Sequence, residues 1–117
     1  DSIFNWSLAF DVNSIYKFLR VLHPIGNMPN ILQKYGFVDK TGKEITTAIF
    51  TSAKDFTEEG VAAVEFLGKW GYIDNTGTVK IPLIYDKAYG FINGVAWVVQ
   101  NGKNRYINKN GNCVKNC

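Results

Sequence analysis

A short pattern occurs three times in this chain, and it limits the fold more than any other feature of the sequence. Residues 69–77 (KWGYIDNTG) nearly copy residues 34–42 (KYGFVDKTG), and residues 103–111 (KNRYINKNG) are a less faithful third copy. Similarity that recurs about every 35 residues is typical of repeat architectures, in which one supersecondary unit stacks on copies of itself. Such arrays usually form binding surfaces rather than catalytic clefts.

The composition favours a mainly β domain. The 117 residues are 46% hydrophobic and 20% charged, but aromatic residues reach 15% and there are 11 glycines. Aromatic side chains suit pleated, half-buried surfaces, and glycines suit tight turns. No apolar run approaches the roughly 18 residues that a membrane span needs.

One complete unit can be followed through residues 69–102. Residues 69–74 and 79–81 predict two short strands, closed by Pro82, which lacks a ladder donor. A connecting stretch over residues 83–93 leads to a third strand over residues 95–100. We expect about three strands per unit. Because the last strand of one unit should pair with the first of the next, the whole should form a continuous antiparallel meander.

The turns between these strands carry specific signals. In each copy an Asp or Asn begins a type I turn, and the following Gly takes the left-handed conformation of a G1 bulge. Asn-Gly between two apolar runs predicts a type I′ turn, because both central residues need positive φ. The expected turn residues are Asp39, Gly42, Asp74, Gly77, Asn101, Gly102, Asn108 and Gly111.

Two further positions recur inside the unit. Tyr85 and Phe91 correspond to Phe50 and Phe56 of the preceding unit, so we expect these rings to fill the core. A glycine, Gly36 or Gly71, lies inside each first strand, where bare backbone often marks a bulge or a close approach. We expect an aromatic ring of a neighbouring strand to lie over each glycine. The alternative is a ligand that approaches the backbone there.

Residues 1–33 fit the repeat poorly and are expected to cap one end of the array. Apolar residues at helical spacing predict a short helix over residues 15–22, with a strand over residues 16–22 as the alternative. Residues 3–10 predict a strand. The predicted organisation is a single domain with a cap segment (1–33), two repeats (34–68 and 69–102) and a partial repeat or C-terminal cap (103–117).

Cys113 and Cys117 form the only cysteine pair in the sequence. In an extended strand they would lie roughly 13 Å apart, too far for a disulfide. A disulfide therefore needs a turn between them or a partner on another chain, and free thiols are the alternative. A metal site would need two further ligands nearby.

The sequence offers little for catalysis. The only histidine and the cysteines have no spacing that suggests a nucleophile and its base, and no glycine-rich loop has a nucleotide-binding pattern. The turn role explains Asp39 and Asp74. We therefore expect no enzymatic activity, no cofactor and no metal.

The net charge is +3, and residues 103–117 contain four basic residues and no acidic ones. Such a basic segment either attracts anionic polymers or only keeps the end of the chain solvated. Nucleic acid is not the expected partner.

The motif Lys-Trp-Gly-Tyr-Ile-Asp, followed by Thr-Gly, Ile-Pro, Tyr-Asp and Gly-Val-Ala, resembles the bacterial WG (KWG) repeat over residues 34–111. Residues 69–102 match closely, whereas Asn104 and Arg105 replace both letters of the family name in the third copy. The resemblance implies a bacterial β-repeat module without general catalytic activity, often exported or surface-associated. Its usual role is protein interaction or architecture. We expect a secreted or cell-surface protein, with a cytoplasmic one as the alternative. The chain starts at Asp1, so a signal peptide removed in processing would not be seen.

Three functions remain open. The first is a protein-interaction or structural module whose surface includes exposed aromatic residues. The second is a self-assembling subunit of a surface or extracellular polymer that uses the N-terminal segment as donor strand. The third is a module that binds carbohydrate or an anionic polymer. The candidate surface residues are Trp70, Tyr72, Trp97, Tyr106 and Arg105, and Trp97 should be the most exposed, because Ala63 holds its place in the preceding unit.

Overall fold

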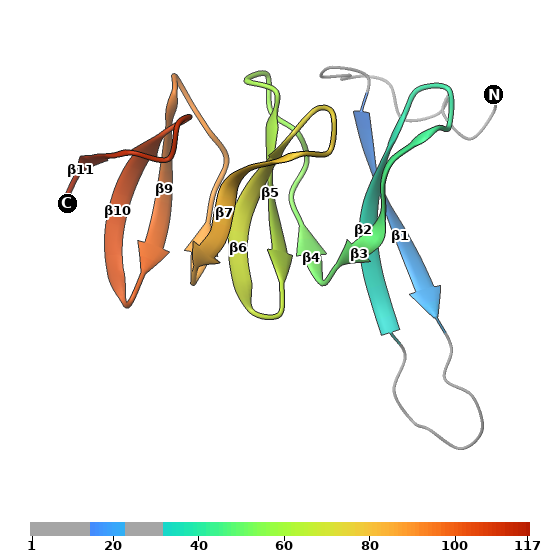
Figure 1. Ribbon diagram of the computed structural model, residues 1–117, viewed down its shortest axis with the longest axis horizontal. Helices are drawn as coiled ribbons and strands as arrows, with labels where there is room; N and C mark the ends of the chain where they lie inside the picture. Colours follow the sequence, from blue (N-terminus) through green and yellow to red (C-terminus); the bar gives the residue numbers. More distant parts are fainter. Residues whose placement is uncertain (1–14, 23–31) are drawn as a thin grey trace.

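The computed structural model describes residues 15–22 and 32–117, except for the side chains of residues 21, 22 and 32. In this part of the chain every regular element is a strand (Figure 1). The strands are β1 (Ile15–Leu22), β2 (Leu32–Asp39), β3 (Glu44–Phe50), β4 (Ser52–Ala53), β5 (Val61–Phe66), β6 (Lys69–Asp74), β7 (Val79–Tyr85), β8 (Lys87–Ala88), β9 (Val95–Gln100), β10 (Lys103–Asn108) and β11 (Cys113–Lys115). The prediction of a mainly β, antiparallel repeat is confirmed.

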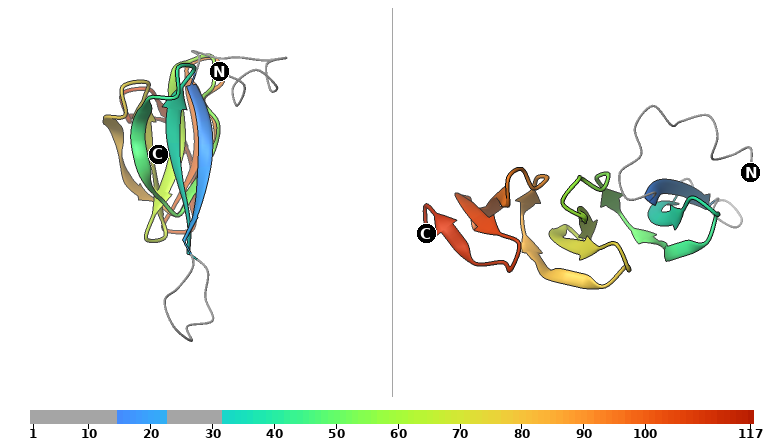
Figure 2. Two further views of the ribbon diagram at one scale, coloured as in Figure 1. Left: turned by 90° about the vertical axis from the view of Figure 1, so that its right-hand side faces the viewer. Right: turned by 90° about the horizontal axis from the view of Figure 1, so that it is seen from above.

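The strands form three antiparallel sheets that follow one another along the array. We name them sheet A (β1-β2-β3), sheet B (β4-β5-β6-β7) and sheet C (β8-β9-β10-β11). Seen from above, each sheet stands beside the next (Figure 2). As expected, the last strand of one unit pairs with the first strand of the next, β5 with β6 and β9 with β10.

The meander is continuous within each sheet but breaks between sheets. The chain leaves sheet A at Thr51 and sheet B at Asp86, the same place in both units. The cause lies in β3 and β7, where the ladder register shifts opposite a glycine and the returning strand bends away. The two residues after each bend then pair with the following hairpin instead.

These bends explain the glycine inside each first strand. A Cβ on Gly71 would lie 2.6 Å from the carbonyl oxygen of Ile81, because the bulged backbone of β7 crosses directly over it. A Cβ on Gly36 would meet both the Phe18 ring, at 2.7 Å, and the carbonyl oxygen of Thr47. The expected aromatic ring thus covers Gly36, whereas backbone rather than a ring covers Gly71.

The predicted helix over residues 15–22 is wrong, and the alternative strand is correct. All eight residues of β1 pair with β2, from Ile15 opposite Asp39 to Leu22 opposite Leu32. β1 takes the position on β2 that β5 takes on β6. An apolar strand edge without a partner is unfavourable, so this tertiary pairing overrides a helical spacing that is only local.

The turns repeat in detail. In each turn the backbone carbonyl of the first residue (Asp39, Asp74 or Asn108) accepts a hydrogen bond from the glycine N–H that closes the turn, at 2.9–3.0 Å. Gly42, Gly77 and Gly111 have φ of 91°, 86° and 84°. Asn101 and Gly102 both have positive φ, as a type I′ turn requires. The β5–β6 turn has the same form, but Leu67 stands in the place of the asparagine, with φ 54°.

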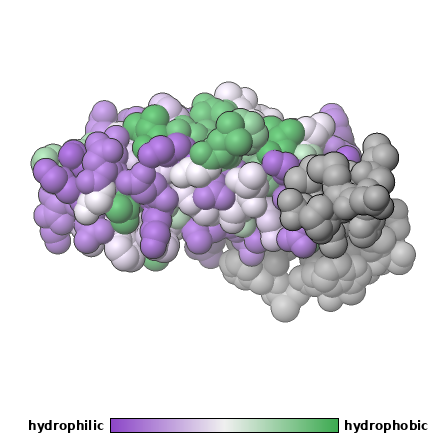
Figure 3. All heavy atoms as spheres, turned by 90° about the horizontal axis from the view of Figure 1, so that it is seen from below, coloured by the Kyte–Doolittle hydropathy of each residue, from purple (hydrophilic) through white to green (hydrophobic). Residues whose placement is uncertain are grey.

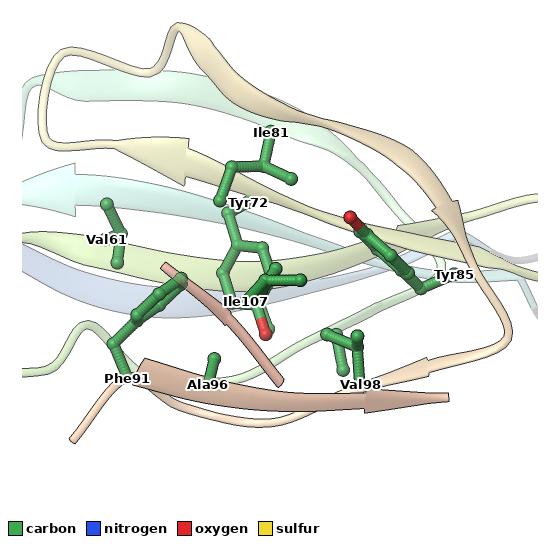
Figure 4. Packing of buried hydrophobic residues seen from close by; sticks show 10 residues of the cluster. Val61, Tyr72, Ile81, Tyr85, Phe91, Ala96, Val98 and Ile107 are labelled. Atoms are coloured by element: carbon green, nitrogen blue, oxygen red, sulfur yellow. The ribbon is translucent and has the colours of Figure 1, made fainter. Parts of the chain in front are cut away.

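Two hydrophobic cores lie between the sheets. One packs between sheets A and B around Phe37, and the other between sheets B and C around Tyr72. Both faces of sheet B are therefore covered, which explains why residues 61–64 of β5 are all buried. In Figure 4 the side chains of the second core converge from both sheets.

The strand predicted for residues 3–10 lies outside the described residues, as does most of the predicted N-terminal cap.

Candidate functional site

The outer face of sheet C is the best candidate site. Sheet B presents Val61, Ala63 and Tyr72 to the second core. Their counterparts on sheet C are Val95, Trp97 and Tyr106, on the face of the sheet that points away from that core. We call Trp97, Tyr106, Tyr89 and Asn104 the end face.

Trp97 is held in a fixed orientation on this face. Its ring stacks on Tyr89 with centroids 4.4 Å apart and planes at 15°. Its indole Nε1–H donates to Oδ1 of Asn104 at 3.1 Å. The residue nevertheless keeps 39% of its surface exposed. A rigid, half-exposed indole with a satisfied polar edge has the properties of an interface anchor.

Trp97 also differs in size from its counterpart in the preceding unit. The equivalent residue, Ala63, is 2% exposed because the second core packs directly against it. An indole in this place occupies the volume that the next core would need. A further unit could pack on this face as sheet C packs on sheet B only if the Trp97 side chain or the packing were rearranged.

Tyr106 lies beside Trp97, since the two residues are directly paired across β9 and β10. The Nζ of Lys115 stands 5.4 Å from the centre of its ring. Its counterparts Phe37 and Tyr72 are fully buried, each under a phenylalanine ring from its own connecting stretch. Tyr106 is only half-buried, so it adds a second aromatic side chain to the end face.

Three of the predicted surface residues, Tyr72, Arg105 and Trp70, do not belong to this face. Tyr72 is fully buried, and its hydroxyl donates a hydrogen bond to the carbonyl of Tyr89. Burial raises the pKa of this hydroxyl far above its ordinary value. Tyr72 is thus a core residue, because it lies mid-strand on the face that sheet C covers. Arg105 alternates with Tyr106 along β10 and points the other way.

Arg105 is half-buried against the second core, and its positive charge partly offsets the burial that raises the pKa of Tyr85. Its place is that of Gly71 in the preceding unit. Arg105 therefore lies on the opposite face of β10 from the exposed rings.

Trp70 is half-buried at the edge of the second core. Sequence reasoning missed its link to the end face, which Lys54 provides. The Nζ of Lys54 lies 5.2 Å from the centre of the Trp70 ring and 5.4 Å from that of Tyr89. A line of cation–π and stacking contacts thus joins Trp70 to Trp97. In the sequence, the only signal for this contact is the presence of a lysine in a chain rich in aromatic residues.

The predicted cysteine pair forms a disulfide within the chain. The Cα atoms are 5.8 Å apart, because Asn116 takes a positive φ of 61° and turns the chain between them. The bond closes the last strand, β11, beside the end face.

The turn aspartates have a structural role. Oδ1 of Asp74 accepts hydrogen bonds from the hydroxyl and N–H of Thr76 and the N–H of Thr78. These bonds, led by the Thr76 hydroxyl, lower the pKa of the carboxyl group. Asp39 makes the same contacts with Thr41 and Lys43, and its pKa is lowered in the same way.

Asp86 connects two turns. It accepts a hydrogen bond from Lys69 at 2.7 Å, and this contact is the main reason why its pKa is lowered. The N–H groups of Gly102 and Asn101 also stabilise the charged carboxylate. Asp86 thus ties the β5–β6 hairpin to the β9–β10 hairpin.

A shallow hollow of about 390 Å³ lies at the opposite end of the strands, between the first two units. It is lined by Ile15, Asp39, Lys43, Glu44, Ile45, Asn75 and Thr76. Among residues 15–22 and 32–117, no three His, Cys, Asp or Glu side chains gather as metal ligands. The same part of the chain has no helix of the length and apolarity that a membrane span requires.

These observations define an antiparallel β-repeat array that has an aromatic end face. The chain belongs to the WG containing repeat family, whose model matches residues 35–70 and 70–103. The glycine in the family name is the residue over which the returning strand bends. No curated protein and no solved structure matches the chain.

Proposed function

We propose that this chain is a non-catalytic protein-interaction module and that the end face is its recognition surface. The observation that carries the proposal is that Trp97 stands where the preceding unit has Ala63. A residue that lets the array continue is replaced by a half-exposed indole, fixed by Tyr89 and Asn104. Aromatic anchors of this kind are enriched where proteins bind one another.

The surroundings of Trp97 support a protein partner with a polar rim. Tyr106 adds apolar area beside it, and the Asn104 side chain and the Lys115 ammonium group supply hydrogen-bond donors at the edge. An apolar centre with a polar border is the usual composition of a specific interface.

A photocrosslinking experiment tests the proposal. A photoreactive phenylalanine analogue replaces Trp97 in one variant and Val79, an exposed residue of β7 on sheet B, in the control variant. In extracts of the source cells, we expect one protein to be crosslinked from position 97 and not from position 79. The purified partner should then bind the Trp97→Ala variant at least about tenfold more weakly, as expected of a hot spot.

The other two hypotheses predict different products. Crosslinks from position 97 to further copies of this chain would favour the self-assembling subunit. Capture of polysaccharide, or of an anionic polymer in a salt-sensitive manner, would favour the third hypothesis. Equal labelling from both positions would contradict a recognition role for Trp97.

We also infer that the protein works outside the cytoplasm, at the cell surface or secreted. The Cys113–Cys117 disulfide supports this location, because such bonds persist in oxidising compartments. Alkylation of intact cells with a mass-shifting thiol reagent tests the inference. Cys113 and Cys117 should be protected, and full labelling of both would favour the cytoplasmic alternative.

A further inference from the structure

A second unusual surface lies at the end of the strands where the β5–β6 and β9–β10 turns are found, here called the turn end. Leu67, at the tip of the β5–β6 turn, is 76% exposed, and three more large apolar residues nearby are about half exposed. Seen from this end, hydrophobic side chains lie together in a band (Figure 3). We call this set the apolar tip; its members are Ile49, Phe66, Leu67 and Ile84.

The strand register brings these residues together. Phe66 pairs with Lys69 across the β5–β6 turn. Ile84 precedes Tyr85, which pairs with Trp70 next to Lys69. Ile49 lies just before the crossing at Thr51, whose N–H donates to the carbonyl of Glu65 at 2.9 Å. The backbones of all four residues therefore lie near the β5–β6 hairpin tip.

Folding alone does not explain Leu67. It has φ 54° at the position where Asn101 stands in the β9–β10 turn. A leucine resists the left-handed conformation, and at this tip its side chain buries little apolar surface. The residue loses on both counts relative to asparagine. A leucine in this position is consistent with a contact that the isolated chain does not make.

The charges around the apolar tip are mostly positive. Lys34, Lys69, Lys87 and Lys103 all stand in or beside the strand ends at the turn end. Of the acidic residues there, Asp86 forms an ion pair with Lys69, and Glu65 accepts a hydrogen bond from the Thr51 hydroxyl but keeps its charge. None of the ion pairs in the described part of the chain involves Lys34, Lys87 or Lys103.

We propose that the turn end docks on an anionic lipid surface, with Leu67 and Phe66 inserted at the headgroup boundary. Exposed apolar residues on a protruding turn, surrounded by lysines, match both components of interfacial binding: apolar burial and attraction to negative headgroups. A second copy of the chain fits less well, because it would bring the same lysines together. The site is separate from the end face and does not depend on the proposed partner binding.

Vesicle co-sedimentation of the whole chain tests the proposal. The probes are vesicles of phosphatidylcholine and phosphatidylserine in equal parts, and vesicles of phosphatidylcholine alone. We expect binding to the first, little binding to the second, and a loss of binding as salt rises. The variant Leu67→Asn should bind about tenfold more weakly.

A matched control is available at the other end of the strands. Ile92 is 74% exposed beside the Asn93–Gly94 turn, so Ile92→Asn removes a similar apolar surface from the wrong end. This variant should bind like the parent. A triple variant, K34Q/K87Q/K103Q, should lose most of the salt-sensitive binding.

Three results would overturn the proposal. The first is no sedimentation with the phosphatidylserine vesicles by the folded protein. The second is an equal effect of Leu67→Asn and Ile92→Asn. The third is binding that the triple variant loses but Leu67→Asn keeps, which would indicate attraction to any polyanion, an acidic protein included.

Discussion

The ring of Tyr72 packs edge-on against the ring of Phe91, with centroids 4.9 Å apart and planes at 67°. Phe37 and Phe56 form the same pair in the preceding unit, also at 4.9 Å. In both units, one ring comes from the first strand and the other from the connecting stretch. The pair therefore joins the segments that the sheet hydrogen bonds do not connect directly, and it holds each core together.

The first prediction separates the ring pair from the hydroxyl group of Tyr72. Phe91→Ala should lower the free energy of unfolding by about 3–5 kcal/mol, because it leaves a cavity in a closed core. Tyr72→Phe keeps both rings and removes only the hydrogen bond to Tyr89, so its cost should be about 1 kcal/mol. Urea unfolding measures both. A larger loss for Tyr72→Phe than for Phe91→Ala would contradict this account of the core.

The second prediction concerns the glycine of the family motif. Gly71→Ala should cost about 1–3 kcal/mol, because its Cβ would meet backbone atoms of Ile81, Pro82 and Leu83 at 2.6–2.7 Å. Gly90→Ala is the control. Its Cβ would meet only the end of the Thr57 side chain, at 3.2 Å, so its cost should stay below about 1 kcal/mol. Equal losses in denaturant unfolding would show that the crossing strand does not select glycine.

Much of this fold could be predicted from the sequence, because turn chemistry and the pairing of strands across short turns are local. Asp74 and Gly77 determine their turn within a few residues, and the copies at Asp39 and Asn108 confirm the pattern. The helix predicted for residues 15–22 failed because β1 gains its stability from β2, and no local pattern shows that pairing.

The candidate site could be predicted only in part. Comparison of Trp97 with Ala63 correctly indicated exposure. The side of β10 on which Arg105 lies, and the contact of Lys54 with two rings, depend on how the sheets stack. The packing of one sheet on the next is set by the bends of β3 and β7. The positions of the expected strands alone do not predict these bends.

The third prediction uses the two type I′ turns as mutual controls. Leu67→Asn should raise the free energy of unfolding by about 1 kcal/mol, since asparagine tolerates the left-handed conformation better than leucine. Asn101→Leu should lower it by a similar amount. Thermal and urea unfolding of the two variants measure these shifts. A loss of stability in Leu67→Asn would mean that the leucine side chain stabilises the fold.

The fourth prediction concerns pH. The folded state lowers the pKa of Asp74 below its ordinary value of 3.8, so its carboxylate stabilises the fold above that pH. This contribution disappears as the pH falls through the lower, folded pKa. Asp74→Asn should keep the turn, because Oδ1 of Asn108 already accepts the equivalent hydrogen bonds from the N–H groups of Asn110 and Asn112. Its deficit in stability at neutral pH should shrink below about pH 4, where the unfolded carboxylate takes up its proton.

The last prediction concerns the Cys113–Cys117 disulfide. A bond that closes so short a loop restricts the unfolded chain by about 2 kcal/mol in the entropy model. β11, however, pairs only with Tyr106 and Ile107 of β10 at the end of the array, and it can open without the cores. Reduction should therefore change the free energy of global unfolding by less than about 1 kcal/mol. Hydrogen exchange should speed up in β10 and β11 alone. Because the bond lies within the chain, reductant should also leave the oligomeric state unchanged. A fall of several kcal/mol, or dissociation of larger species on reduction, would show that these cysteines support more than the last strand.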